Sequence, residues 1–209
     1  MLEKKSTLLL SLTIILSTLI VPALNVYIYF STVDFSWLLN ELVKTGSINQ
    51  DAEQILTPKI LMSFTIATTC VATAMVMVFW YLYFRRLFEK RCAGSSGDDV
   101  VDYVCFSFIG SAVSAWITFF LLLTRDVSQA RLNDLKVFSI NSLWLNQEAD
   151  SKWYSVATSV DIMSLLGFAA VLFLFDRYSS KSMMVNFGLA ILPDVVFYGL
   201  WSIYLYFKR

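Results

Sequence analysis

Two carboxylates inside apolar stretches are the residues of this 209-residue chain best placed for chemistry. Asp161 lies within residues 153–175 and Asp194 within residues 183–207, and neither stretch contains a lysine or an arginine. A charged side chain at the bilayer centre costs about 2.5–3.5 kcal/mol on insertion scales, so each acid should face a helix bundle. There a carboxyl can carry a proton, bind a cation or hold helices together through hydrogen bonds. Ser164, three residues after Asp161, is within helical reach of it.

The surroundings of Asp194 suggest a polar site of its own. Tyr198 lies one helical turn after it and Asn186 two turns before it. Pro193 has no backbone N–H, so a helix through this region leaves the carbonyl of Leu189 without its usual partner. A kink with a free carbonyl beside an acid can bind a cation or relay a proton. The alternative is that both acids only hold helices together.

Other kinds of chemistry find little support. The chain has no histidine, which removes the commonest metal ligand and general base. Cys70, Cys92 and Cys105 show no metal-binding spacing, and there is no phosphate-binding loop or nucleophile motif. We therefore expect no enzyme, no metal and no cofactor. A net charge of zero also argues against a nucleic-acid partner.

The elements that must position these acids are membrane helices. The chain is 57% hydrophobic, with a mean hydropathy of +0.65, and its apolar runs are long enough to cross a bilayer. We predict an all-α polytopic protein, a single membrane domain of residues 1–209 with five transmembrane helices. The spans are expected at residues 8–30, 58–84, 100–124, 153–175 and 183–207. The first run also resembles a signal peptide, but its apolar character continues to Phe30, which favours a retained anchor.

A short amphipathic helix is expected over residues 34–46. Its apolar residues recur with helical spacing, Asp34 can cap its start and Gly46 its end. It should lie on the membrane surface as an interfacial helix or cap the bundle. In the third span, small residues are spaced to form a ridge for helix packing. They are Ser107, Gly110, Ser111 and Ser114. The polar loop of residues 125–152 holds one apolar island, residues 137–145, expected at the interface.

Basic residues suggest an orientation. They are about twofold denser in the connecting segments on the side of the N-terminus than in those on the other side. We therefore expect the N-terminus in the cytoplasm and the C-terminus outside, in a membrane that is most simply a bacterial inner membrane.

Two segments resemble the Yip (Ypt/Rab-interacting protein) domain family, in the form of its small prokaryotic members. They are Asn141-Ser-Leu-Trp-Leu and Ser159-Val-Asp-Ile-Met-Ser-Leu, and residues 97–112 (GDDVVDYVCFSFIGSA) fit as well. The resemblance covers about residues 58–207 and makes Asp161 a family position. It implies an integral membrane protein without enzymatic activity; eukaryotic relatives are linked to vesicle trafficking and Rab-type GTPases. About seven residues precede the first span, so we do not carry over GTPase binding.

Two functions follow as hypotheses. The first is a non-enzymatic membrane protein of the Yip type that organises or assists other membrane components. The second is a small transporter or channel subunit that uses Asp161 and Asp194 to handle ions or protons. The expected partners are the lipid bilayer and either another membrane protein or further copies of the chain. A hydrated cavity at either acid would favour the second hypothesis.

Replacing each acid by asparagine tests the transport hypothesis. Asn keeps the shape and hydrogen-bonding capacity of Asp but carries no titratable proton, so Asp161→Asn and Asp194→Asn should abolish proton or ion flux in proteoliposomes while the protein still folds. If flux and folding survive both changes, the transport hypothesis is wrong.

Overall fold

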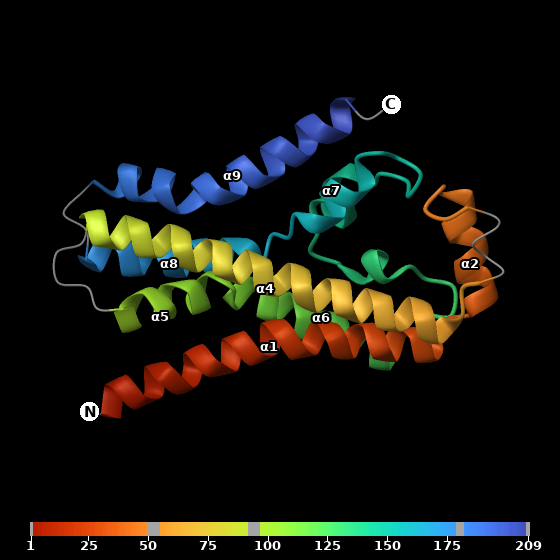
Figure 1. Cartoon of the computed structure of the whole chain (residues 1–209), viewed down its shortest axis with the longest axis horizontal. Coiled ribbons are helices and arrows are strands. Elements are labelled where there is room, and N and C mark those ends of the chain that lie inside the picture. Colours follow the sequence, from red (N-terminus) through yellow and green to blue (C-terminus); the bar gives the residue numbers. More distant parts are fainter. Residues whose placement is uncertain (1, 50–54, 92–96, 179–181, 208–209) are drawn as a thin grey trace.

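A computed structural model describes residues 2–49, 55–91, 97–178 and 182–207 (Figure 1). Every regular element in these residues is helical, and the sole pairing of extended backbone is an isolated antiparallel bridge between Ser139 and Asp161. The all-α prediction is confirmed, and long apolar helices support a multi-pass membrane protein.

Four helical segments are long and apolar enough to cross a membrane. They are Leu9–Thr32 in helix α1 (Leu2–Thr32), Pro58–Leu87 in α4 (Pro58–Arg91), Val100–Thr124 across α5 (Gly97–Ser107) and α6 (Ile109–Thr124), and Met183–Phe207, which is α9. At the start of α4, the hydroxyl of Thr57, the residue before Pro58, accepts a hydrogen bond from the N–H of Ile60. The limits of these four segments follow the apolar runs of the sequence, because only a helix satisfies its own backbone hydrogen bonds within lipid.

The fourth predicted span is not one helix, which corrects the prediction of five continuous spans. Residues 153–175 form α7 (Tyr154–Ser159) and α8 (Ser164–Tyr178), separated by a break around Asp161. The apolar part of α8, Ser164–Phe173, is shorter than a full span. The break has a local cause, since the side chain of Asp161 accepts the backbone N–H of Met163 at 2.8 Å. Side-chain bonds of this kind compete with the helix.

The third span is also interrupted, at Phe108 between α5 and α6. The two broken helices pack side by side through glycines. A Cβ placed on Gly110 would lie 1.9 Å from the carbonyl oxygen of Met163, and one on Gly167 would lie 2.2 Å from that of Ser107. No side chain larger than hydrogen fits either position, so these glycines set the distance between the two helices.

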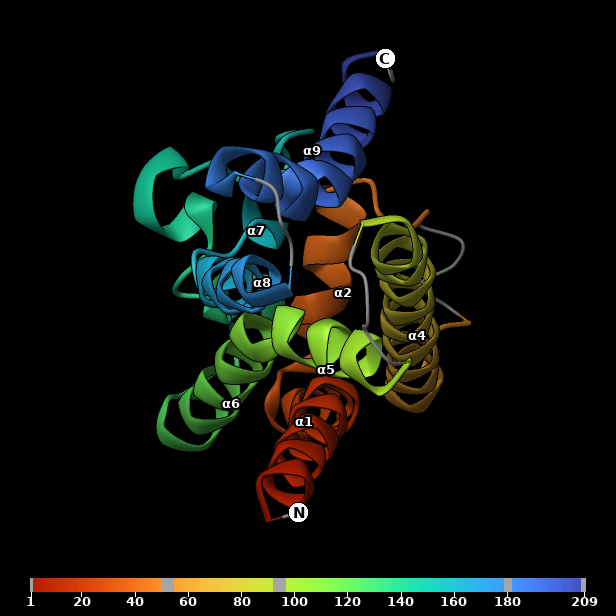
Figure 2. The ribbon, with the colours of Figure 1, turned by 90° about the vertical axis from the view of Figure 1, so that its left-hand side faces the viewer.

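The remaining helices pack around this pair. Helix α1 packs on α6, α4 and α5, while α5 also contacts α4 and α8, and α8 contacts α9. Figure 2 looks along the bundle and shows α5 between α1, α4 and α8. The apolar core lies in two clusters. One includes Phe84, Tyr103, Val171 and Ala190, and the other includes Tyr29, Leu38, Leu122 and Leu135.

The amphipathic helix α2 (Phe35–Lys44) caps one end of the bundle (Figure 1). Asp34 accepts the N–H groups of Ser36 and Trp37, and Gly46 follows with a φ of 66°, as the capping pattern predicts. The helix packs on protein, because Leu38 is buried with residues of the loop after α6 and the N–H of Asp34 donates to the Ser128 carbonyl at 2.8 Å. Of the two expected placements, the structure shows the bundle cap.

Alanine at Gly110 tests the close approach. The added methyl meets backbone that cannot rotate away, so Gly110→Ala should lower the unfolding free energy by about 1–3 kcal/mol. Gly188→Ala in α9 is the matched control, since a Cβ there meets nothing within 4 Å. Thermal unfolding of both purified variants in detergent measures the difference. Equal stability of the two variants would contradict this packing.

Candidate functional site

The loop after α6 enters the bundle and pairs with the break before α8. The N–H of Ile140 donates to the Val160 carbonyl at 2.8 Å, and the N–H of Ile162 donates to the Phe138 carbonyl at 3.0 Å. Ser139, between them, is completely buried. The apolar island of residues 137–145 was expected at the interface. Its later part, with the exposed Trp144, is compatible with that, but its first residues lie inside the protein.

Asn141 closes the turn that follows. Its side-chain oxygen accepts the N–H of Gln147 at 2.8 Å, and its Nδ2 donates to the Gln147 carbonyl at 3.2 Å. A single π-helical turn, η2 (Asn141–Leu145), lies between them and ends at Asn146 in the left-handed region. Asn141 therefore shapes the loop that enters the bundle.

Asp161 joins the helix break to α6. One carboxylate oxygen accepts the hydroxyl of Ser114, and the other accepts the Met163 N–H. The predicted neighbour Ser164 donates its hydroxyl to the backbone carbonyl of Asp161 at 2.6 Å. The partner of the carboxylate is thus a member of the small-residue ridge on α6, and Ser164 holds the start of α8.

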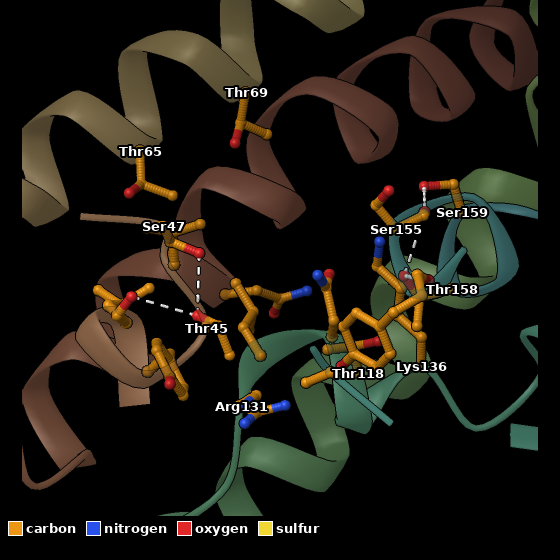
Figure 3. Close-up of a pocket in the computed structure, with 18 of the residues that line it drawn as sticks. Thr45, Ser47, Thr65, Thr69, Thr118, Arg131, Lys136, Ser155, Thr158 and Ser159 are labelled. Carbon is orange, nitrogen blue, oxygen red and sulfur yellow. Dashed lines mark hydrogen bonds between the residues drawn. The ribbon is translucent and has the colours of Figure 1, made fainter. Parts of the chain in front are cut away.

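A cavity of about 1180 Å³ opens beside Asp161 (Figure 3). Its walls come from α1, α2, α4, α6, α7, α9 and the loop. Many of its lining side chains are hydroxyls, which can both donate and accept hydrogen bonds. They include Thr65, Thr69, Ser111, Ser114, Thr118, Ser155, Thr158 and Ser159. A polar space of this size within a membrane bundle is the kind of place where ligands bind.

Charged residues of both signs line this cavity. The loop brings Arg131 and Lys136 to it, so cations reach this space although the predicted spans contain no lysine or arginine. Burial lowers the pKa of Lys136, and the nearby carboxylate of Asp161 opposes this shift. Arg131 forms an ion pair with Glu41 of α2, and this hydrogen bond lowers the pKa of the Glu41 carboxyl. This ion pair holds α2 against the loop that lines the cavity.

Asn25 of α1 presents a buried polar atom to the same cavity. Its Nδ2 donates to the Ala115 carbonyl at 2.9 Å, which joins α1 to α6. Its Oδ1 accepts no hydrogen bond from the part of the chain that the structure describes, although the residue is only 5% exposed. A buried acceptor without a donor costs about 1–3 kcal/mol.

Asp194 does not line this cavity. The carbonyl of Leu189, which Pro193 deprives of its helical partner, accepts the hydroxyl of Tyr83 on α4 at 2.7 Å. It is therefore not the free cation ligand proposed from the sequence. Tyr198 donates to the Ser159 carbonyl at 3.1 Å and interacts electrostatically with both Asp194 and Asp161.

Several polar residues lie in the cavity wall without having been predicted there, among them Lys136, Arg131 and Asn25. Asp102, near the start of the third span, accepts the hydroxyl of Ser11 at 2.7 Å. Asn186, which was predicted, is completely buried in α9. Among the described residues, no group of three or more His, Cys, Asp or Glu side chains is arranged to hold a metal ion.

Comparison with known proteins gives no relative. No protein-family model matches the chain, and neither a curated protein nor a solved structure matches it. The resemblance to the Yip family stays a prediction.

The ion pair between Glu41 and Arg131 makes a testable contribution to stability. Because the folded-state pKa of Glu41 is lowered, its contribution is present above the ordinary glutamate pKa of 4.5 and is lost as pH falls through the lowered value. Glu41→Gln should destabilise the protein at pH 7, and should destabilise it less at pH 4, below the ordinary glutamate pKa. Arg131→Gln should add almost nothing to Glu41→Gln, because the two residues act as a pair. Thermal unfolding at both pH values measures this, and additive losses would contradict the pairing.

Proposed function

We propose that this chain is an integral membrane protein, without catalytic activity of its own, that binds a small polar ligand in the cavity beside Asp161. The cavity itself is the observation that carries the proposal: about 1180 Å³ lined by hydroxyls, by Asp161 and by Lys136. Several of these hydroxyls donate to carbonyls of their own helices, whereas charged groups among membrane helices are costly unless water or a ligand solvates them. Packing alone would be served better by apolar side chains.

The position of the cavity favours access from one membrane face. Its wall includes α2 and the loop with Arg131, which lie at the end of the bundle opposite the N-terminus of α1 (Figure 1). From the density of basic residues, we propose that this end faces outward and that the N-terminus lies in the cytoplasm. A bacterial inner membrane remains the proposed location.

Organisation of other membrane components, as in the Yip family, is the second candidate. One observation favours it: the two segments that carry the resemblance are parts of a single structural unit. The hydrogen bonds of Ile140 and Ile162 join residues immediately beside Asn141 to the strand-like turn at Asp161. In this case the unit is a rigid platform, and Asp161 serves packing through Ser114.

Thiol labelling separates the two candidates. In a background with Cys70, Cys92 and Cys105 changed to alanine, cysteine is placed in the cavity by Thr65→Cys or Ser155→Cys. Phe197→Cys is the control, because this side chain is exposed on α9 where the bilayer would surround it. A membrane-impermeant maleimide should label both cavity positions from one face and leave the control unlabelled, since only hydrated thiols form thiolate.

Gln129→Cys, in the exposed loop, shows that the reagent reaches this face. If Gln129→Cys is labelled and neither cavity position is, the cavity is closed to water. The ligand-binding proposal is then wrong, and the Yip-type organiser becomes the better account.

A further inference from the structure

Two polar groups in the cavity wall lack a matching partner. The ammonium of Lys136 has no carboxylate within 4.0 Å in the described part of the chain, although Asp161 is close enough to interact with it electrostatically. The Oδ1 of Asn25 is buried and accepts no hydrogen bond from the described residues. The first can only donate and the second can only accept. A ligand that satisfies both needs an anionic oxygen and a hydrogen-bond donor.

Most other charges of the cavity have partners, and the remaining carboxylate, that of Asp150, is exposed at the cavity wall. Arg131 is paired with Glu41, and Asp161 accepts two hydrogen bonds from the protein. Lys152 lies over the rings of Trp153 and Tyr206, 5.6 and 5.7 Å from their centroids. Lys136 is therefore the cation best placed to meet an incoming anion. A phosphate ester with a hydroxyl or ammonium group has the required chemistry.

The cavity wall also has an apolar side. Leu61 of α4 and Leu205 of α9 both line the cavity. These two helices diverge toward this end of the bundle, as both ribbon views show (Figures 1 and 2). No residue of the apolar window of α4 is buried, so the bilayer surrounds most of this helix. An acyl chain that leaves the cavity beside Leu61 would follow α4 into the hydrocarbon.

We infer that the ligand is a phospholipid whose headgroup enters the cavity from the side, with its phosphate at Lys136 and its hydroxyl or ammonium at the Oδ1 of Asn25. Its acyl chains leave beside Leu61 and follow α4. This inference rests on the proposed function and names the ligand class of the same site. The free phosphate ester of the same headgroup shares the recognition chemistry but lacks the chains.

Lipid retention measures this directly. The protein is reconstituted in nanodiscs of phosphatidylglycerol and phosphatidylethanolamine, extracted in mild detergent, and examined by native mass spectrometry for bound phospholipid. Lys136→Gln should lower the retained phospholipid about fivefold, the loss expected for one cationic contact with a headgroup. Lys136→Arg should restore retention, which shows that charge rather than folding is responsible. Lys59→Gln, at an exposed lysine in the first turn of α4, should leave it unchanged.

Glycerol 3-phosphate and phosphoethanolamine are the soluble probes, with binding measured by calorimetry on the same protein. Equal lipid retention in the Lys136→Gln and Lys59→Gln variants overturns the inference. If a soluble ester binds in a Lys136-dependent way and no lipid is retained, the lateral entry of a lipid is overturned. The proposal that the cavity binds a small polar ligand then stands. If neither probe nor lipid binds while the cavity thiols are still labelled, the phosphate chemistry is wrong and the hydrated cavity of the proposed function stands.

Discussion

The backbone pairing of residues 138–140 with residues 160–162 is the constraint on which the site depends. A helix that breaks within a membrane leaves N–H and C=O groups without partners, each at a cost of several kcal/mol. Here the loop after α6 supplies those partners through the hydrogen bonds of Ile140 and Ile162. The break therefore requires the loop to enter the bundle. Because the loop enters, Lys136 and Arg131 reach a space that the spans alone would leave without a cation.

A second constraint is the contact between the two interrupted helices. Gly110 and Gly167 allow backbone to meet backbone at the two breaks, and Ser114 fixes the carboxylate of Asp161 from the same side. The cavity lies where α6 and α7 separate beyond this contact, and α2 covers it through the ion pair of Glu41 with Arg131. Polar groups are thus concentrated on one side of the close contact between the two interrupted helices.

Much of the fold is predictable from the sequence, because lipid imposes simple rules. The limits of α9 agree with an apolar run bounded by polar residues, and the start of α2 follows from Asp34. The break at Asp161 is not visible in this way, since residues 153–175 contain no charged residue apart from that one acid. The segment that pairs with the break lies some twenty residues earlier, and a bridge of so few residues has no periodic pattern. The apolar island beside Lys136 was the one available signal that this loop does not stay in water.

The bridge between Ser139 and Asp161 also sets an order of assembly. Its two halves flank α7, and neither has a regular structure of its own that would hold it in place within the hydrocarbon. The four long spans can insert independently, since each satisfies its backbone internally. The segment from the loop to α8 gains the hydrogen bond of Ser114 and the close contact of Gly110 only when α6 is already beside it. We therefore expect this polar loop to enter the membrane after the helices that receive it.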